Sequence, residues 1–183
     1  MAASIEHYQL PLPRLDGARL LIVVAPYYRQ IAEALIAGAR QVAADAGATV
    51  DLVEVPGALE VPTAIGLAAA RGLYDGYVAL GCVIRGETTH YDTVCNDSSR
   101  GITLLGLQGH CIGNGILTVE NYEQAAVRAD PATQNKGGGA AAAALHLIAL
   151  KRGWDRQSPR GDAPGGARDV IRLAGEIDGP RGA

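Results

Sequence analysis

The chain has 183 residues, 48% of them hydrophobic, which is enough apolar material for one sizeable core, so we expect a single folded domain. Its formal net charge is −3, with both signs scattered along the sequence, and this pattern offers neither a basic stripe for nucleic acid nor a polybasic patch for membranes. We therefore expect neither nucleic acid nor a membrane among its partners.

Short β-branched apolar runs alternate with longer alanine-rich segments along the chain. This order is typical of βαβ units, and it predicts an α/β fold in which helices cover both faces of a parallel sheet. Before the first strand, Pro11 and Pro13 exclude a central strand, so residues 1–15 are expected to form an N-terminal arm or an edge strand. The expected strands are residues 20–25, 49–53, 77–81 and 111–118, and the expected helices are residues 28–46, 59–71, 89–107, 120–128 and 135–151.

Two of these helices have sequence patterns that bear on their packing. The third has an apolar stripe at three- and four-residue steps, formed by Tyr91, Val94, Cys95, Ser98, Ile102 and Leu105. The last contains AAAAALHLIAL, whose small alanines permit close packing against either the sheet or a neighbouring subunit, and the run alone leaves both open.

From residue 153 the chain becomes rich in Gly, Pro, Arg and Asp, which predicts a flexible C-terminal tail over 153–183 with at most a short helix near 169–177.

The cysteines and the N-terminal sequence indicate the compartment. Cys82, Cys95 and Cys111 lie far apart, form no C-x-x-C pair and stand in apolar surroundings, as buried thiols of a reducing compartment do. Disulfides and a zinc site are therefore not expected. The first residues lack a basic start followed by an apolar run, so we expect a cytoplasmic protein.

The most informative stretch is GCVIRGETTH, residues 81–90, where an apolar strand passes through a turn into a helix that carries a histidine. Parallel α/β proteins bind ligands at this place, and the amides of a helix start suit a phosphate or carbonyl oxygen. Gly86 permits close backbone approach, and Thr88 or Thr89 can cap the helix. The His90 imidazole can exchange protons near neutral pH, but it could equally be a cap or core histidine.

Four motifs together identify a known family. VPGALE (residues 55–60), GCVIRGETTHYDTVCN (81–96), NGILTVEN (114–121) and RADPATQNKGG (128–138) resemble, in order and spacing, the 6,7-dimethyl-8-ribityllumazine synthase family. The resemblance covers residues 16–152, which we take as the domain. It implies a flavodoxin-like three-layer α/β/α sandwich assembled into homopentamers, with active sites at subunit interfaces.

The resemblance also implies a reaction, the penultimate step of riboflavin biosynthesis. In it 5-amino-6-(D-ribitylamino)uracil condenses with 3,4-dihydroxy-2-butanone 4-phosphate, releasing phosphate and water, without a metal or organic cofactor. His90 then resembles the family's catalytic histidine, which acts in the proton transfers. The other histidines, His7, His110 and His146, are expected to be packed or solvated.

For the pyrimidine and its ribityl chain, the resemblance implies a stacking aromatic at Tyr27, with Tyr28 packing instead. The other implied contacts come from Ala58, Leu59, Glu60, Cys82, Val83, Ile84 and Lys136, those of 82–84 through the backbone. Read without the family, Glu60 could simply complement a helix dipole and Lys136 could be an ordinary surface lysine. Leu59 and Asn114 stand where many members have aromatic residues, and Asn114 is placed to act from the neighbouring subunit.

For the phosphate, the resemblance implies the amides around Gly86, Glu87 and Thr88 together with the guanidinium of Arg128. Arg128 alone would read as a solvated helix-end residue. The Glu87 side chain is expected to point away from an anion, and Arg85 is expected to form a structural ion pair.

Two further interpretations stay open at this stage: a flavodoxin-like module that binds a flavin or lumazine without catalysis, and a protein whose main product is its assembly. Within the family some members form capsids. Pro131 lies where capsid formers have a more permissive turn, which favours a free pentamer.

Overall fold

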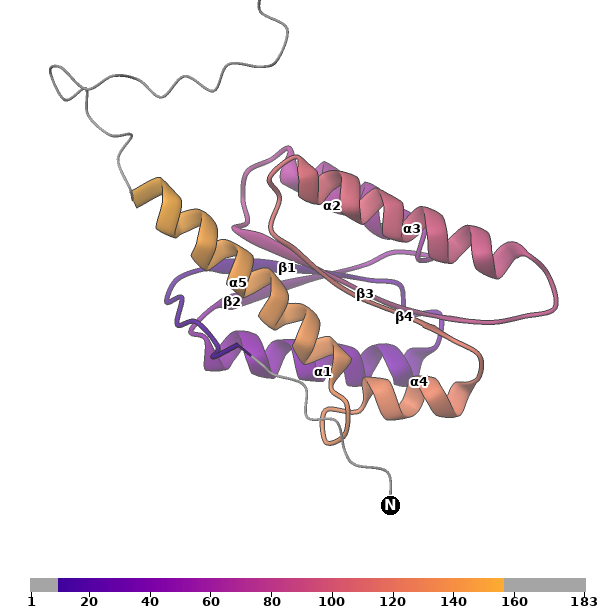
Figure 1. Ribbon diagram of the computed structural model, residues 1–183. Helices are drawn as coiled ribbons and strands as arrows, with labels where there is room; N and C mark the ends of the chain where they lie inside the picture. The colour runs from indigo at the N-terminus through magenta and orange to yellow at the C-terminus, as the bar shows by residue number, and fades with distance from the viewer. Residues whose placement is uncertain (1–9, 157–183) are drawn as a thin grey trace, which may run out of the picture.

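Four strands form one parallel sheet in the order β2-β1-β3-β4 in the computed structural model, which describes residues 10–156 (Figure 1). The strands are β1 (Arg19–Val24), β2 (Thr49–Glu54), β3 (Gly76–Ile84) and β4 (Ile112–Val119). The helices are α1 (Arg29–Asp45), α2 (Glu60–Ala69), α3 (His90–Leu107), α4 (Tyr122–Ala129) and α5 (Lys136–Arg156). The expected α/β sandwich with a four-stranded parallel sheet is confirmed.

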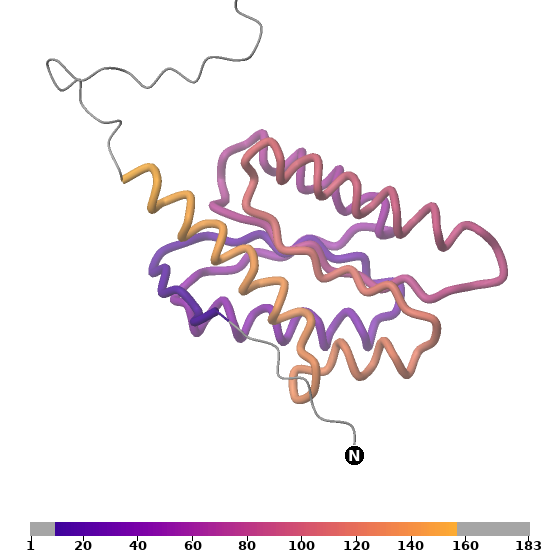
Figure 2. The backbone as a smooth tube through the Cα atoms, in the orientation of Figure 1, coloured from indigo at the N-terminus to yellow at the C-terminus, as the bar shows by residue number. Residues whose placement is uncertain are grey.

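The helices lie in two layers, one on each face of the sheet. Helices α1, α4 and α5 cover one face, and α2 and α3 cover the other, as the backbone trace shows (Figure 2). Strand β1 is buried on both faces of the sheet. Ile22 belongs to the core between the sheet and α1, α4 and α5, and Val23 belongs to the core between the sheet and α2 and α3. A strand covered on both faces has no polar alternation, which is why residues 20–25 read as one continuous apolar run.

Two elements are longer than the sequence predicted. Strand β3 continues to Ile84, whereas a turn was expected from Gly81, because the backbone of Gly81 stays extended and its position packs against Ala25. Helix α5 continues to Arg156, past the predicted end at residue 151. The chain beyond residue 156, with its expected short helix at 169–177, lies outside the described residues, as does His7.

The predicted stripe on α3 is confirmed. Val94, Ser98 and Ile102 are buried, and the three other members of the stripe are half-buried. Ile102 joins the core between α3 and the sheet, so this stripe fixes the rotation of α3 about its axis. His90, one turn before Val94, is thereby directed toward the same end of the sheet.

The alanine-rich helix α5 packs within its own chain, against α1 and the sheet. A Cβ atom at Gly137 would collide with the main-chain carbonyl of Leu35 in α1, and one at Gly113 in β4 would collide with the carbonyl of Ala140. Ala141, Ala144 and Leu145 are fully buried in this contact. The close approach therefore depends on glycine and alanine on both sides, and it settles the choice between sheet and neighbouring subunit for the buried face.

The described part of the N-terminal arm, residues 10–15, forms no strand. Leu15 is buried, and its N–H donates to the carbonyl of Ala46 at 2.7 Å, which fixes the chain just before β1. Leu10 and Leu12 are exposed. Among residues 10–156, none of the helices combines the length and the apolar character needed to cross a bilayer.

We predict that Gly137→Ala lowers the free energy of unfolding by about 1–3 kcal/mol, because the added methyl group forces α5 away from α1. Gly139→Ala is the matched control on the same helix, since a Cβ atom there meets nothing within 4 Å. Urea unfolding of both variants, at one fixed protein concentration, measures the difference. Equal stabilities of the two variants would contradict the close packing.

Candidate active site

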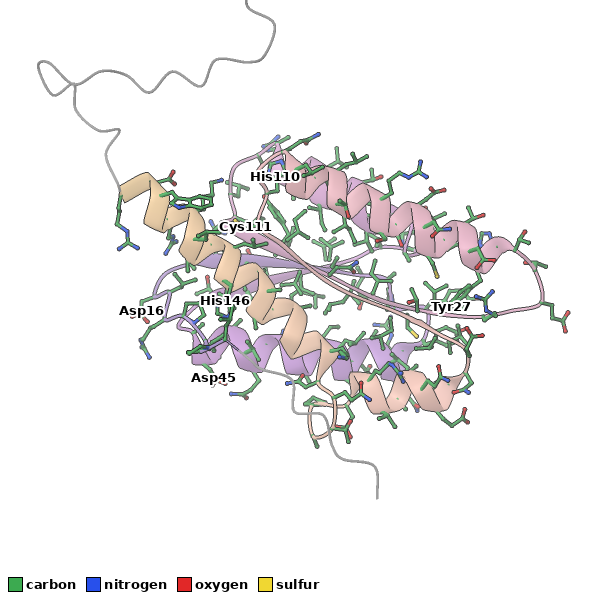
Figure 3. All side chains as sticks on the ribbon, viewed as in Figure 1. Asp16, Tyr27, Asp45, His110, Cys111 and His146 are labelled. Atoms are coloured by element: carbon green, nitrogen blue, oxygen red, sulfur yellow. The ribbon has the colours of Figure 1, made fainter. Side chains whose placement is uncertain are left out.

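The carboxyl end of the sheet contains a topological switch point between β1 and β3. The chain leaves β1 toward α1 on one face and leaves β3 toward α3 on the other, so a crevice opens between the two loops. Open parallel sheets bind ligands in such a crevice. Tyr27 marks this end in Figure 3, whereas His110 and His146 lie toward the opposite end.

A cleft of about 450 Å³ occupies this position, within the usual range for small-molecule sites. Its walls are the three loops that follow β1, β2 and β3, together with the first turn of α3. The lining residues are Ala25, Tyr27, Tyr28, Pro56, Gly57, Ala58, Leu59, Glu60, Cys82, Val83, Ile84, His90 and Val94. Eight of the residues singled out from the sequence are therefore brought together: Tyr27, Ala58, Leu59, Glu60, Cys82, Val83, Ile84 and His90.

The floor of the cleft is the free end of β3. Strand β1 ends at Val24, opposite Leu80, while β3 continues to Ile84 paired only with β4. On the side where β1 has ended, the backbone of residues 82–84 has no neighbouring strand. Main-chain N–H and C=O groups must be paired when a ligand covers them, so this segment is suited to a flat ring with several donors and acceptors.

The two adjacent tyrosines have different surroundings. Tyr28 is half-buried and packs against the core, and its burial raises its pKa. Tyr27 is 77% exposed and meets Tyr28 edge to face at 5.1 Å between ring centroids. The Tyr27 ring thus lines the cleft while most of its surface remains open, so it is available for stacking on a flat ligand.

Glu60 begins α2 on the opposite wall. Its carboxylate lies close over Gly57, where a Cβ atom would come within 3.0 Å of Oε2, and its N–H donates to the Gly57 carbonyl at 3.2 Å. The glycine of VPGALE therefore makes room for the carboxylate. An exposed carboxylate at this place can accept hydrogen bonds from hydroxyl groups.

His90 is the first residue of α3 and is exposed at the mouth of the cleft. The Thr88 hydroxyl accepts a long hydrogen bond from the His90 N–H, 3.4 Å, whereas Thr89 makes no side-chain cap. No atom lies within 4 Å of a Cβ position at Gly86, so the fold itself does not require glycine there and the loop leaves space for a ligand.

Arg85, at the other end of this loop, is the centre of an ion-pair cluster, as the sequence predicted. Its Nε donates to Glu120 Oε2 at 2.9 Å and its Nη1 to Asp92 Oδ1 at 3.3 Å. The guanidinium also lies 4.0 Å above the ring centroid of Tyr91, a close cation–π contact.

Cys82 is the one thiol in the cleft. Burial raises its pKa to about 11, so the group is a neutral thiol at physiological pH and a poor nucleophile. All three cysteines are free, with Cys82 and Cys111 buried and Cys95 half-buried. Among residues 10–156 no three His, Cys, Asp or Glu side chains are grouped as a metal site requires.

The remaining five predicted site residues do not line the cleft. Glu87 and Thr88 are exposed in the loop beside it. Asn114 is exposed on the edge strand β4, where its Oδ1 accepts from the Ile116 N–H. The other two are Arg128, whose Nη1 donates to the Gln124 carbonyl in α4, and Lys136 at the start of α5. Helices α4 and α5 cover the face of the sheet opposite α3.

Five lining residues were not among the predicted site residues: Ala25, Tyr28, Pro56, Gly57 and Val94. Two of them, Ala25 and Val94, have a signal in the sequence. Val94 was assigned to the buried stripe, yet it lies one helical turn after His90 and so shares its direction. Ala25 ends the run that forms β1, and the end of a strand at a switch point is a lining position. Both could have been found from these two spacings.

Comparisons with known proteins agree with one another. The family model described as 6,7-dimethyl-8-ribityllumazine synthase matches residues 17–152. A protein of that name from Jannaschia sp. is 54% identical over 166 residues, which is 90% of this chain and 92% of the relative. Those from Novosphingobium aromaticivorans and Methylobacterium radiotolerans are 54% and 56% identical, covering 75% and 81% of this chain and 99% and 91% of the relatives.

We predict that Cys82 reacts slowly with iodoacetamide at pH 8. With a pKa of about 11, only about one molecule in a thousand carries the thiolate at that pH. As the pH is raised toward the pKa, the rate of alkylation should increase roughly tenfold for each pH unit. Mass spectrometry of the alkylated peptides measures the rate, with the urea-unfolded protein as the control. Alkylation of folded and unfolded protein at the same rate at pH 8 would contradict the burial of this thiol.

Proposed function

The chain belongs to the 6,7-dimethyl-8-ribityllumazine synthase family of riboflavin biosynthesis, and we propose that it catalyses the reaction for which that family is named. The substrates are 5-amino-6-(D-ribitylamino)uracil and 3,4-dihydroxy-2-butanone 4-phosphate. The products are the lumazine, phosphate and water. The observation that carries the proposal is the convergence of Tyr27, Glu60 and His90 on one cleft from three successive loops.

In the proposed complex, the pyrimidine lies against Tyr27 and above residues 82–84, whose main-chain groups pair with the heterocycle. Glu60 accepts hydrogen bonds from the ribityl hydroxyls. The 5-amino group attacks the ketone carbon and water leaves to give the imine. The loss of phosphate follows. The ribitylamino nitrogen then closes the ring on the remaining carbonyl carbon with release of a second molecule of water, and His90 moves the protons in these steps.

One chain does not supply every group that this reaction needs. The phosphate carries negative charge, yet the cleft lining contains Glu60 and has neither arginine nor lysine. Arg128 and Lys136 have cationic side chains that could bind a phosphate. In the same chain, however, they belong to α4 and α5, on the face of the sheet opposite α3. We therefore propose that a neighbouring copy contributes Arg128, Lys136 and Asn114, while the amides around Gly86, Glu87 and Thr88 hold the phosphate from the first copy.

Such a shared site requires an oligomer. Large apolar side chains are exposed on the helices of the α2–α3 layer, including Leu67 at 70% and Leu107 at 81%. Exposed leucines of this kind support burial against another subunit. We propose a cytoplasmic homopentamer of domains spanning residues 16–152, preceded by an N-terminal arm over residues 1–15. Light scattering that found a megadalton shell would contradict a free pentamer.

We predict that the purified protein accelerates lumazine formation from the two substrates, and that His90→Ala lowers the rate because the proton transfers lose their donor and acceptor. The increase in lumazine absorbance measures the rate above the spontaneous condensation. His110→Ala is the matched control, since His110 lies at the opposite end of the sheet beside Tyr77. Binding of lumazine without any acceleration would instead favour a non-catalytic binding module.

A second prediction tests the shared site. His90→Ala and Arg128→Ala chains should each be impaired, but mixed pentamers assembled from equal amounts should recover up to about one quarter of the wild-type rate. In a cyclic assembly, each site takes His90 from one chain and Arg128 from its neighbour. When the two variants are mixed randomly in equal amounts, both residues are intact at about one interface in four. Co-expression with two different affinity tags isolates the mixed assemblies. If mixing recovers nothing while both variants assemble, each site is built from a single chain.

A further inference from the structure

We propose that Arg85 is a positioning residue, which fixes the first turn of α3 and thereby holds His90 in the cleft. The proposal rests on the proposed function, because it assigns a role through the catalytic histidine. The Arg85 guanidinium does not line the cleft and carries no catalytic step itself.

The contacts of Arg85 join three elements at one point. Its main-chain N–H donates to the Val119 carbonyl at 2.9 Å, which anchors the end of β3 to the end of β4. Its side chain binds Glu120, directly after β4, at 2.9 Å, and Asp92, in the first turn of α3, at 3.3 Å. Tyr91, the residue next to His90, lies beneath the guanidinium at 4.0 Å. The two residues that follow His90 are thus both in contact with Arg85.

The loop between these anchors has few contacts of its own. Residues 86–89 are exposed, and the one side-chain hydrogen bond found for these four residues is the 3.4 Å contact between the Thr88 hydroxyl and the His90 N–H. Within residues 10–156, no hydrogen bond to the His90 imidazole is found. The position of the imidazole therefore depends on the backbone at the start of α3, and the Arg85 cluster holds that backbone from its C-terminal side.

The charges explain why Arg85 acts as an anchor and not as an anion-binding group. Two carboxylates, Glu120 and Asp92, already bind its Nε and Nη1 and offset its charge. The fork of the guanidinium can contact both acids and the Tyr91 ring at once, which a lysine ammonium cannot do. Exposed ion pairs of this kind contribute little to stability, so the cluster is expected to act on geometry.

The experiment is a double-mutant cycle on the full chain, with lumazine formation as the readout. Arg85→Gln should lower kcat several-fold, by no more than His90→Ala does, with little change in the KM for the ribitylaminouracil, because the pyrimidine contacts are untouched. Arg85→Lys should restore only part of the loss. In the His90→Ala background, Arg85→Gln should cause no further loss, since the group it positions is gone.

Arg19→Gln is the matched control. Arg19 also pairs with an acid, Asp51 at 3.3 Å, and lies over a tyrosine ring, Tyr74 at 5.2 Å, but it stands at the opposite end of the sheet. It should leave kcat unchanged. Thermal melts and sizing of every variant separate a loss of geometry from a loss of folding or assembly.

The outcomes separate this inference from the function on which it rests. Losses from Arg85→Gln and His90→Ala that multiply in the double variant would overturn the positioning role while leaving the synthase reaction in place. An equal loss from Arg19→Gln would also overturn it, because any arginine–tyrosine contact would then suffice. A wild-type protein that forms no lumazine would overturn the proposed function itself.

Discussion

The register between β1 and β3 is the constraint on which the rest of the site depends. The two strands pair from Leu20 opposite Gly76 to Val24 opposite Leu80, and then β1 ends while β3 continues beside β4. This difference in length leaves the backbone of residues 82–84 uncovered and opens the cleft at the switch point. A β1 strand longer by a few residues would pair with that backbone and fill the place where a ligand can bind. The shared register is itself fixed by the buried side chains on both faces of β1, because a slip by one residue would exchange the two cores.

Ion pairs at the carboxyl end of the sheet hold the loops that surround this cleft. Arg29, which begins α1, binds Glu54 at the end of β2 at 2.6 Å, and Arg85 at the end of β3 binds Glu120 after β4 at 2.9 Å. Hydrogen bonding to Arg29 lowers the pKa of Glu54, so this carboxylate stays charged at mildly acidic pH. Each pair is largely exposed and therefore contributes little to stability. Their common effect is to connect the ends of two lining loops to neighbouring strand ends, the loop of Tyr27 through Arg29 and the loop before His90 through Arg85.

The sequence predicted most of this architecture, and the differences have local causes. All four strands and five helices were expected, because apolar runs of β-branched residues alternate with amphipathic or alanine-rich segments. The end of β3 was placed too early because Gly81 resembles a strand breaker, although a Cβ atom at this position would make only ordinary contacts with Ala25 and Ile116 and the strand continues through it. Seven of the eight cleft residues came from the family motifs, and Tyr27 came from its place in the family after the first strand. Their convergence follows from the sheet order, which sequence periodicity does not reveal. The position of Arg128 and Lys136 away from the cleft of their own chain could not be predicted either, because a single sequence does not show which copy of the chain provides a side chain.

The arrangement of charge links the chemistry to the assembly. The cleft of one chain contains a carboxylate and an imidazole but no arginine or lysine, so a phosphorylated substrate entering it would lie near Glu60 without a fixed counter-charge. Amine and ketone condense once they are held together, and much of the acceleration in such a reaction comes from binding both partners in one orientation. The group that fixes the phosphate is then as important as the group that moves protons. In the proposed pentamer these two groups belong to different copies, so the subunit contact determines the distance between the two substrates. A chain that folds without its neighbour would keep His90 and Tyr27 in place and still lack the cation that holds the second substrate.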